Sequence, residues 1–323
     1  MVDFAYTETM TEIAGLARAI LDDNVNPARL AEVDGFKHRF DDALWRKLIG
    51  SGVVAALLPE ELGGDGLGAL ELAAVQIELG RALAPVPLLE TVVAATAFGT
   101  AFEAGISTVA TETELSTEGS ALTGSASLVP YAAAAEQVLL LGTDTAWRVP
   151  VADTELTVQE LVDGRSAARL EFSGLTGTRL DCAPGRIRDR LALGRCAHQL
   201  GVLERALELT AEYARTREQF GRPIGSFQAV SHRLADCYID IEALRLTLWQ
   251  AVTSGTAADL ATVRYHAAEA GHRVAHAAVH VHGGAGLDMD NALHRFFLAA
   301  KRNEFTIGAA RETLVELGGL LAR

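Results

Sequence analysis

Two long helical patterns are joined by the run Thr216-Arg217-Glu218-Gln219-Phe220-Gly221-Arg222-Pro223-Ile224-Gly225-Ser226-Phe227-Gln228. Its glycines and proline are turn residues, so the run predicts a tight corner between two helices. The corner projects a guanidinium, an aromatic ring and an amide, from Arg217, Phe220 and Gln228. Arginine suits bidentate contact with a pyrophosphate, phenylalanine offers a flat apolar surface, and glutamine offers a donor and an acceptor. The alternative is a surface turn with a solvated arginine.

Helical patterns continue from this corner in both directions, over residues 184–323. Apolar residues recur at intervals of three and four, and short links join the segments, which predicts an antiparallel bundle. The apolar stripes are Leu193, Ala197, Leu200, Leu207, Ala211 and Ala214; Val230, Leu234, Cys237, Ile241, Leu244 and Leu248; a third that follows Thr256 and ends at Gly283-Gly284; and a final helix with Ile307, Ala310, Leu314 and Leu317.

The first 103 residues also carry helical periodicity. Three stretches show it, namely Thr9–Leu21, Asp42–Gly50 and Ala69–Ala84. The loop Leu57–Gly66 stops one helix with a proline and glycines before the next begins, and Pro85 and Pro87 interrupt the pattern again. We expect an N-terminal helical domain over residues 1–103.

Residues 104–183 read as a small, reduced β domain. Short β-prone runs alternate with turns there: Ala121–Gly124, Gln137–Leu141, Trp147–Val151, Thr157–Val162 and Arg169–Phe172. The expected fold is therefore mostly α with a small β domain, in the order helical domain, β domain, helical bundle.

Composition and charge exclude several classes of partner and site. The chain has 323 residues, is 49% hydrophobic and carries a formal net charge of −14, which disfavours a nucleic acid partner. An anionic ligand would need particular arginines. The three cysteines have no paired or metal-ligand spacing. The start shows no targeting signal, and no apolar run approaches the roughly 20 residues of a membrane helix, so we expect a cytoplasmic protein without membrane insertion.

A second motif is His280-Val281-His282-Gly283-Gly284-Ala285-Gly286. Its glycines at a helix end allow another backbone or a phosphate to approach closely. The two histidines are two positions apart and lie on different helix faces, so they make a poor metal pair. Core or interface histidines are the simpler interpretation.

These two motifs, with Leu58-Pro59-Glu60-Glu61-Leu62-Gly63-Gly64, resemble the acyl-CoA dehydrogenase family over nearly the whole chain. The resemblance implies the same three-part fold, FAD as cofactor, and oxidation of an acyl-CoA thioester between Cα and Cβ, with a glutamate as base. It implies that the corner reaches the ADP half of a neighbouring subunit's FAD. The implied FAD contacts are Arg217, Phe220, Gln228, His280, Gly283 and Gly284, with His280 where many relatives place glutamine.

The sequence departs from the family at the positions of the catalytic base. Ile307 stands where most relatives have the catalytic glutamate, and Leu191 stands at the alternative base position. Asp189 and Glu304 are nearby acids, but each is more simply a helix-start acid or part of a solvated face. We therefore assign no catalytic residue to this chain.

The flavin-ring pocket departs as well. The strand that lies against the flavin ring in relatives reads Gly124–Pro130 here, without the usual Trp or Thr, and the other ring-pocket strand is at best Val109–Glu112. The chain resembles the subunit of bacterial heterotetrameric, steroid side-chain type acyl-CoA dehydrogenases that completes the FAD site of a partner.

That resemblance implies a second dehydrogenase-like subunit carrying the glutamate, an acyl-CoA substrate of which steroid-CoA is one candidate, and an electron acceptor for the reduced flavin. Two alternatives stay open. One is a self-sufficient homo-oligomer that uses Asp189 or Glu304 as its base, and the other is a non-enzymatic interaction module.

Overall fold

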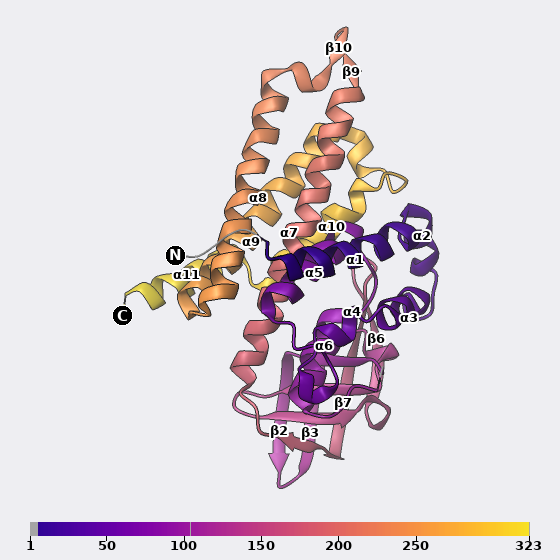
Figure 1. Ribbon diagram of the computed structural model, residues 1–323, viewed down its shortest axis with the longest axis vertical. Coiled ribbons are helices and arrows are strands. Elements are labelled where there is room, and N and C mark those ends of the chain that lie inside the picture. Colours follow the sequence, from indigo (N-terminus) through magenta and orange to yellow (C-terminus); the bar gives the residue numbers. More distant parts are fainter. Residues whose placement is uncertain (1–5, 104, 323) are drawn as a thin grey trace. The chain divides into compact units, whose positions relative to one another are not determined.

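The computed structural model describes residues 6–103 and 105–322 (Figure 1). Helices come first, strands follow, and helices complete the chain, which confirms the expected fold class. Contacts group the chain into two compact units. We call Met1–Leu21, Ala73–Ala84 and Ala192–Arg323 the bundle unit, and Asp22–Leu72 and Pro85–Leu191 the sheet unit. The division into domains at 103/104 and 183/184 stays a prediction, although the secondary structure changes type near both boundaries.

The N-terminal helices have recognisable start and stop signals. Asn26 accepts a hydrogen bond from the Arg29 amide, and Asp41 accepts one from the Leu44 amide, so each caps the helix that follows it. The stretch expected to be helical over Ala69–Ala84 ends as a helix at Ala82. Leu83, two residues before Pro85, adopts a left-handed φ of 52°. These helices are α1 (Glu8–Asn24), α2 (Pro27–Asp34), α3 (Asp42–Gly50), α4 (Val53–Ala56), the 3-10 turn η1 (Glu60–Leu62), α5 (Ala69–Ala82) and α6 (Leu88–Phe98).

The strands form two four-stranded sheets. One has the order β1-β4-β5-β8 and the other β2-β3-β7-β6, with all neighbours antiparallel except β1 and β4. The strands are β1 (Ser107–Ala110), β2 (Glu112–Glu118), β3 (Ala121–Pro130), β4 (Gln137–Leu141), β5 (Ala146–Pro150), β6 (Glu155–Glu160), β7 (Ser166–Thr176) and β8 (Thr178–Leu180). Five of them contain or overlap the expected runs. The sequence did not indicate β2, because Glu112–Glu118 is too polar to show an apolar alternation.

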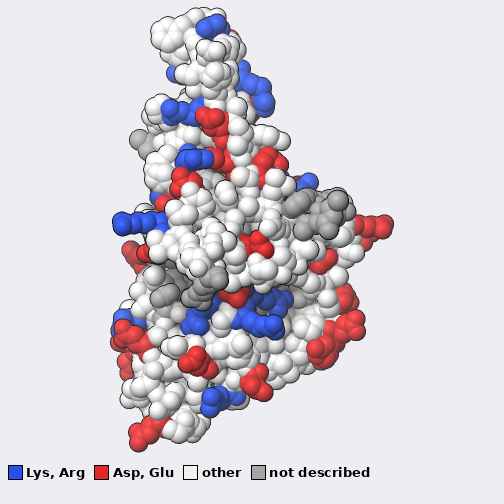
Figure 2. All heavy atoms as spheres, turned by 90° about the vertical axis from the view of Figure 1, so that its left-hand side faces the viewer, with Lys and Arg blue, Asp and Glu red and all other residues white. Residues whose placement is uncertain are grey.

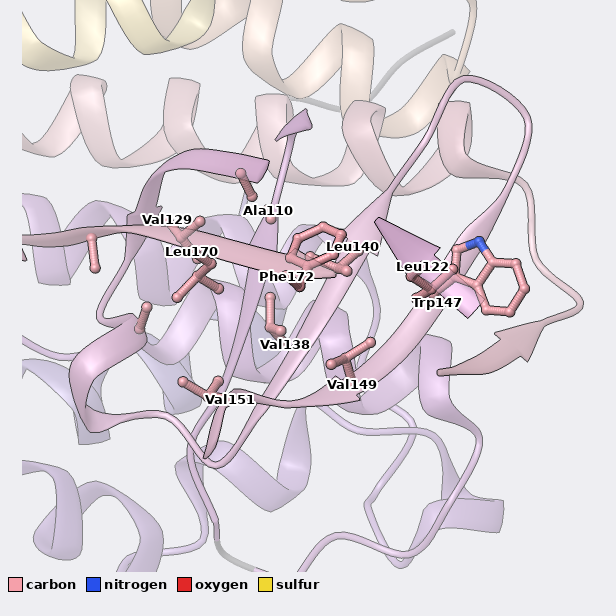
Figure 3. Packing of buried hydrophobic residues seen from close by; sticks show 13 residues of the cluster. Ala110, Leu122, Val129, Val138, Leu140, Trp147, Val149, Val151, Leu170 and Phe172 are labelled. Carbon is pink, nitrogen blue, oxygen red and sulfur yellow. The ribbon is translucent and has the colours of Figure 1, made fainter. Parts of the chain in front are cut away.

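Apolar side chains from both sheets share one core (Figure 3). Val138 and Leu140 point into it from β4, and Leu170 and Phe172 point into it from β7. The two-residue period of a strand places these pairs on one face of each sheet. The small β domain is therefore a two-layer sandwich with its own hydrophobic core.

The C-terminal helices are α7 (Pro184–Thr216), α8 (Gln228–Ser254), α9 (Ala257–His282), α10 (Leu293–Ile307) and α11 (Ala310–Leu321). The expected final helix is wrong in one respect, because Ile307 ends α10 whereas Ala310 begins α11. Gly308 separates them with φ 106° and ψ 125°, which lie outside the helical region. Nε of Arg264 donates to the Ile307 carbonyl at 2.9 Å, so the end of α10 keeps a hydrogen-bond partner.

Two glycines set the distance between α5 and α7 within the bundle unit. A Cβ atom added to Gly80 would lie 2.2 Å from the His198 carbonyl oxygen, and one added to Gly201 would lie 1.9 Å from the Ile77 carbonyl oxygen. No real Cβ contact is so short, so the two backbones pack directly against each other. Close helix packing, and not space for a ligand, explains Gly201.

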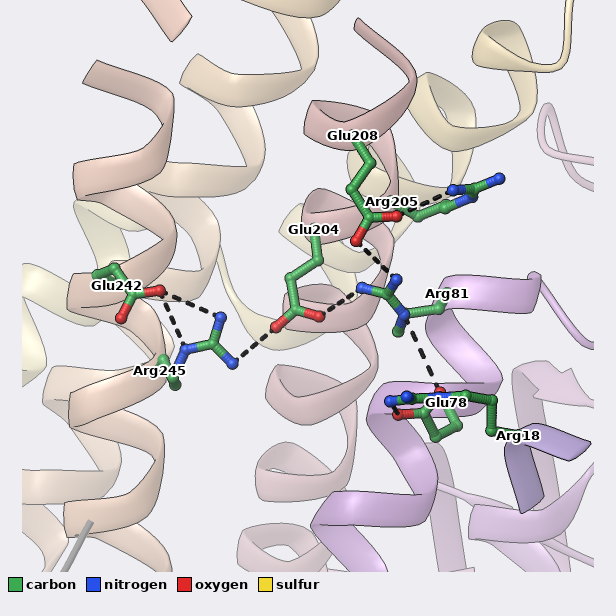
Figure 4. Close-up of polar contacts among 8 residues, drawn as sticks. All are labelled: Arg18, Glu78, Arg81, Glu204, Arg205, Glu208, Glu242 and Arg245. Atoms are coloured by element: carbon green, nitrogen blue, oxygen red, sulfur yellow. Dashed lines mark hydrogen bonds and ion pairs between the residues drawn. The ribbon is translucent and has the colours of Figure 1, made fainter. Parts of the chain in front are cut away.

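A chain of ion pairs runs beside this crossing and joins α1, α5, α7 and α8 (Figure 4). Arg81 binds Glu204 at 2.8 Å and Glu208 at 2.6 Å, and Arg245 binds the other oxygen of Glu204 at 2.9 Å. The side chain of Glu204 is only 13% exposed, so its charge needs both arginines.

Within residues 6–103 and 105–322, none of the helices combines the length and apolar character that crossing a bilayer requires. The same part of the chain has no cluster of three or more His, Cys, Asp or Glu side chains suited to a metal ion.

Gly201→Ala should destabilise the chain by about 1–3 kcal/mol, because the added methyl group forces α5 and α7 apart. Gly15→Ala is the matched control: Gly15 lies in α1 with nothing within 4 Å of an added Cβ, and alanine there should stabilise the helix by about 0.5–1 kcal/mol. Urea unfolding of the three proteins gives both values. Equal stability of Gly201→Ala and the unsubstituted chain would contradict the backbone contact.

Candidate functional site

The predicted corner is a β-hairpin at the tip where α7 and α8 meet (Figure 1). Strands β9 (Glu218–Gln219) and β10 (Arg222–Pro223) pair antiparallel, with Gln219 opposite Arg222. Phe220 and Gly221 form the two-residue loop with φ of 54° and 76°. Positive φ at both central positions is the mark of a type I′ turn. Glycine accepts this conformation freely, whereas phenylalanine accepts it at an energetic cost.

The three predicted contacts of the corner are all exposed. The Phe220 residue is 91% exposed and meets Phe227 edge to face, with ring centroids 6.1 Å apart. The guanidinium of Arg222 covers the Phe227 ring at 4.2 Å. Arg217 follows the last residue of α7, and Gln228 begins α8. At the tip, at the top of Figure 2, Lys or Arg side chains stand among a mostly uncharged surface.

The glycine motif lies beside the end of α7. The rings of Tyr213 and His282 stack with centroids 4.2 Å apart and planes at 17°, and this contact joins the end of α7 to the end of α9. Gly283 and Gly284 follow in a 3-10 turn, η5 (Gly283–Leu287), and are exposed. A Cβ added to either would meet nothing within 4 Å, so both glycines face open space.

The two histidines of the motif have different environments. His282 is buried, as expected for a core histidine, and its Nδ1 lies 2.9 Å from the Ala278 carbonyl oxygen. His280 is exposed and lines a groove of about 630 Å³ between α8 and α9, together with Arg233 and Arg273. No role for Tyr213 followed from the sequence. It lies about one turn before the end of α7 and far from the glycine motif along the chain, so no local pattern indicated the contact.

The positions where the family carries its base are apolar and buried. Ile307 is 3% exposed, and Leu191 is 0% exposed. Glu304 forms an ion pair with Lys301, and its Oε1 lies 3.6 Å from Nδ1 of His272. Asp189 lies exposed near the start of α7. The side chains of Ile307 and Leu191 cannot accept a proton. The carboxylate of Glu304 is already paired with Lys301.

The strand expected against the flavin ring shows a register shift. Between Ala126 and Val129, the pairing of β3 with β7 slips, and Leu128 has a left-handed φ of 55° with its side chain half exposed. Its amide donates to Oε1 of Gln159 at 2.7 Å. Val129 points into the sandwich core. The side chains of this segment are thus aliphatic or small and offer no aromatic surface.

Two family models match the chain. The N-terminal domain model of acyl-CoA dehydrogenases matches residues 7–113, and the C-terminal domain model matches residues 185–314. The acyl-CoA dehydrogenase FadE27 of Mycobacterium tuberculosis (strain ATCC 25618 / H37Rv) is 41% identical, with 99% of each chain covered. The chain belongs to the acyl-CoA dehydrogenase family.

Solved structures of relatives agree with this assignment. A chain of the ChsE4-ChsE5 complex from Mycobacterium tuberculosis is 40% identical, with 99% of each chain covered and a TM-score of 0.91. A variant of the Tcur3481-Tcur3483 steroid ACAD is 36% identical, with 98% of each chain covered and a TM-score of 0.91. The expected enzyme class and, at the level of the family, its FAD cofactor are confirmed.

The buried His282 gives a pH prediction. Burial lowers the pKa of His282 below the ordinary 6.5, and the hydrogen bond with the Ala278 carbonyl, which raises the pKa, offsets only part of this effect. The folded chain therefore favours the neutral ring, so this contribution to stability is complete above pH 6.5 and is lost as the pH falls through the lowered folded pKa. His282→Phe keeps a ring against Tyr213 but cannot titrate.

The free energy of unfolding should then fall less steeply with decreasing pH in His282→Phe than in the unsubstituted chain. Denaturant titrations at several pH values below neutrality measure both slopes. Burial also lowers the pKa of His266, which is present in both proteins and leaves a residual slope. Identical slopes would contradict the buried, neutral state of His282.

Proposed function

We propose that this chain is the subunit of a mixed acyl-CoA dehydrogenase that completes the FAD site of a partner chain, which itself carries the catalytic base. The observation that carries the proposal is an asymmetry. Groups suited to the ADP half of FAD stand exposed at one tip, whereas the positions suited to a base hold buried Ile307 and Leu191. The chain would thus bind one half of the cofactor and leave the chemistry to the other subunit.

The exposed groups fit the ADP half of FAD in kind. Arg217 supplies a guanidinium for the pyrophosphate, Phe220 an apolar ring surface, and Gln228 a donor and an acceptor. Gly283 and Gly284 leave open space at the end of α9, where a polyanionic ligand can approach the backbone. His280 would add a further polar contact. FAD, when bound, accepts the hydride that leaves Cβ of the acyl chain.

The hairpin makes this half-site rigid. A two-residue type I′ loop leaves the chain little freedom, and the contacts of the Phe227 ring with Phe220 and Arg222 hold the tip from inside. A pre-organised contact surface loses less entropy when a ligand or partner binds. Positioning, and not proton transfer, is the role that we assign to this chain.

The partner would supply the glutamate that removes the α proton. Heteromeric relatives support this part of the proposal: ChsE4 and ChsE5 form a complex, and Tcur3481-Tcur3483 is a steroid ACAD. By analogy, we propose an acyl-CoA substrate of the steroid-CoA class and an electron acceptor that reoxidises the flavin. The proposed compartment is the cytoplasm.

Flavin content tests the division of labour. The chain purified alone should retain little FAD and show no dehydrogenase activity, whereas the complex with its partner should be yellow and active. The measurement is the ratio of flavin absorbance to protein, for each chain and for the complex. Yellow, active protein from this chain alone would point to a self-sufficient enzyme, and a colourless, inactive complex would point to a non-enzymatic module.

Arg217→Ala in the complex should weaken FAD binding by about 1.5–3 kcal/mol, or roughly tenfold to a hundredfold, through loss of a charged donor. Arg215→Ala is the matched control, because Arg215 is 68% exposed at the end of the same helix and pairs with Glu212. Fluorescence titration of FAD into the apo-complex gives both constants. Equal constants for Arg217→Ala and Arg215→Ala would remove Arg217 from the site.

A further inference from the structure

A second candidate site lies in the sheet unit, far along the chain from the hairpin. A cleft of about 220 Å³ opens between the loop that joins α2 to α3 and the strands β6 and β7. This volume is below the 300–1,000 Å³ of typical cofactor pockets, so the cleft suits a small group and not a whole nucleotide. Its lining includes Lys37, Arg39 and Arg165 as cations and Asp34 and Glu160 as acids.

Two of the cations are not engaged. Among the residues that the structure describes, neither the Lys37 ammonium nor the Arg39 guanidinium has a hydrogen bond or an ion pair. Arg165, by contrast, donates from Nη1 to the Tyr131 hydroxyl at 2.9 Å. Lys37 is exposed and Arg39 half-buried, and both line the cleft.

The loop that carries these cations is clamped at both ends. Asp41 is buried and binds Arg29 through both carboxylate oxygens, at 2.6 and 2.7 Å, and its amide donates to the Pro85 carbonyl at 3.1 Å. At the other end, the amide of Arg39 donates to the Phe36 carbonyl at 3.1 Å. Phe40 also meets the Tyr131 ring edge to face at 6.3 Å. The positions of Lys37 and Arg39 are therefore fixed before any ligand arrives.

Two features of this loop, at Arg39 and His38, are energetically unfavourable. Arg39 has φ 45°, a left-handed conformation that side-chain-bearing residues rarely adopt. Nδ1 of His38 is fully buried without a hydrogen-bond partner. A glycine at position 39 would avoid the first cost. Strain that is kept at a cation facing a cleft is typical of a functional position.

We propose that this cleft binds a phosphate group, with Lys37 and Arg39 as its charged ligands. Two unengaged cations match the charge of a phosphate, about −1.5 to −2 at neutral pH, better than that of a single carboxylate. The planar fork of Arg39 suits two phosphate oxygens, and Lys37 supplies a point charge. Arg165 also lines the cleft, and its positive charge offsets the acids of the lining.

Calorimetric titration of the full-length chain with inorganic phosphate at low ionic strength tests the proposal. We expect saturable binding of one phosphate per chain. Arg39→Gln and Lys37→Gln should each weaken it roughly tenfold to a hundredfold, the range for loss of one charged hydrogen-bond donor. Arg169→Gln removes the same charge from a half-exposed position on β7, outside the cleft lining, where Arg169 pairs with Glu171. This variant should bind phosphate like the unsubstituted chain.

Arg39→Gly separates binding from folding. Glycine accepts the left-handed φ of position 39, so this variant should unfold at the same or a higher temperature while its phosphate affinity falls. Absence of saturable binding by the unsubstituted chain would overturn the proposal. An equal loss of affinity in Arg169→Gln would also overturn it, because the binding would then reflect only net charge.

Competition distinguishes the two sources of a phosphate group. If adenosine 3′,5′-bisphosphate displaces the bound phosphate, the cleft recognises the phosphate of a larger ligand. If only inorganic phosphate or sulfate displaces it, the cleft recognises the free ion. Both outcomes support a phosphate site, and both are independent of FAD binding at the hairpin.

Discussion

Helices α5 and α7 meet backbone to backbone in the bundle unit, because Gly80 and Gly201 present no side chain to the opposing carbonyl groups. This contact fixes the rotation of α7 about its axis. With Gly201 turned toward α5, the neighbouring Gln199 is fully buried, and its Nε2 donates to the Ala300 carbonyl at 3.2 Å. Nδ2 of Asn303 donates to Oε1 of Gln199 at 2.8 Å. Polar groups at this depth need every partner, so the register of the bundle has few alternatives.

The same helix ends at the candidate site. Once α7 is fixed, Tyr213 meets the ring of His282, and the hairpin follows Thr216, three residues beyond that contact. The ion pair between Arg81 and Glu204 holds α7 nearer its middle, nine residues before Tyr213. A rigid scaffold thus presents a short, strained loop, which is how binding groups are commonly positioned in proteins.

Much of this arrangement was predictable from the sequence, because periodicity and turn residues are local signals. The helices α1, α3, α7, α8 and α9, the sandwich strands with apolar runs, and the tight corner follow from such patterns. The break at Gly308 was missed although glycine is a local stop signal. The partner of the freed Ile307 carbonyl is Arg264, which comes from another helix and which no local pattern indicates. The Tyr213–His282 stack and the cleft beside Arg39 depend likewise on residues far apart in the sequence.

The exposed ring of Phe220 has a consequence for how the chain is made. A phenylalanine that is 91% exposed at a protruding turn is apolar surface that water does not favour, and such surfaces promote association. If the surface that covers it belongs to a second polypeptide, copies synthesised in excess keep it uncovered. Balanced production of the two polypeptides, for example from adjacent genes under one promoter, would then limit aggregation as well as supply a working enzyme.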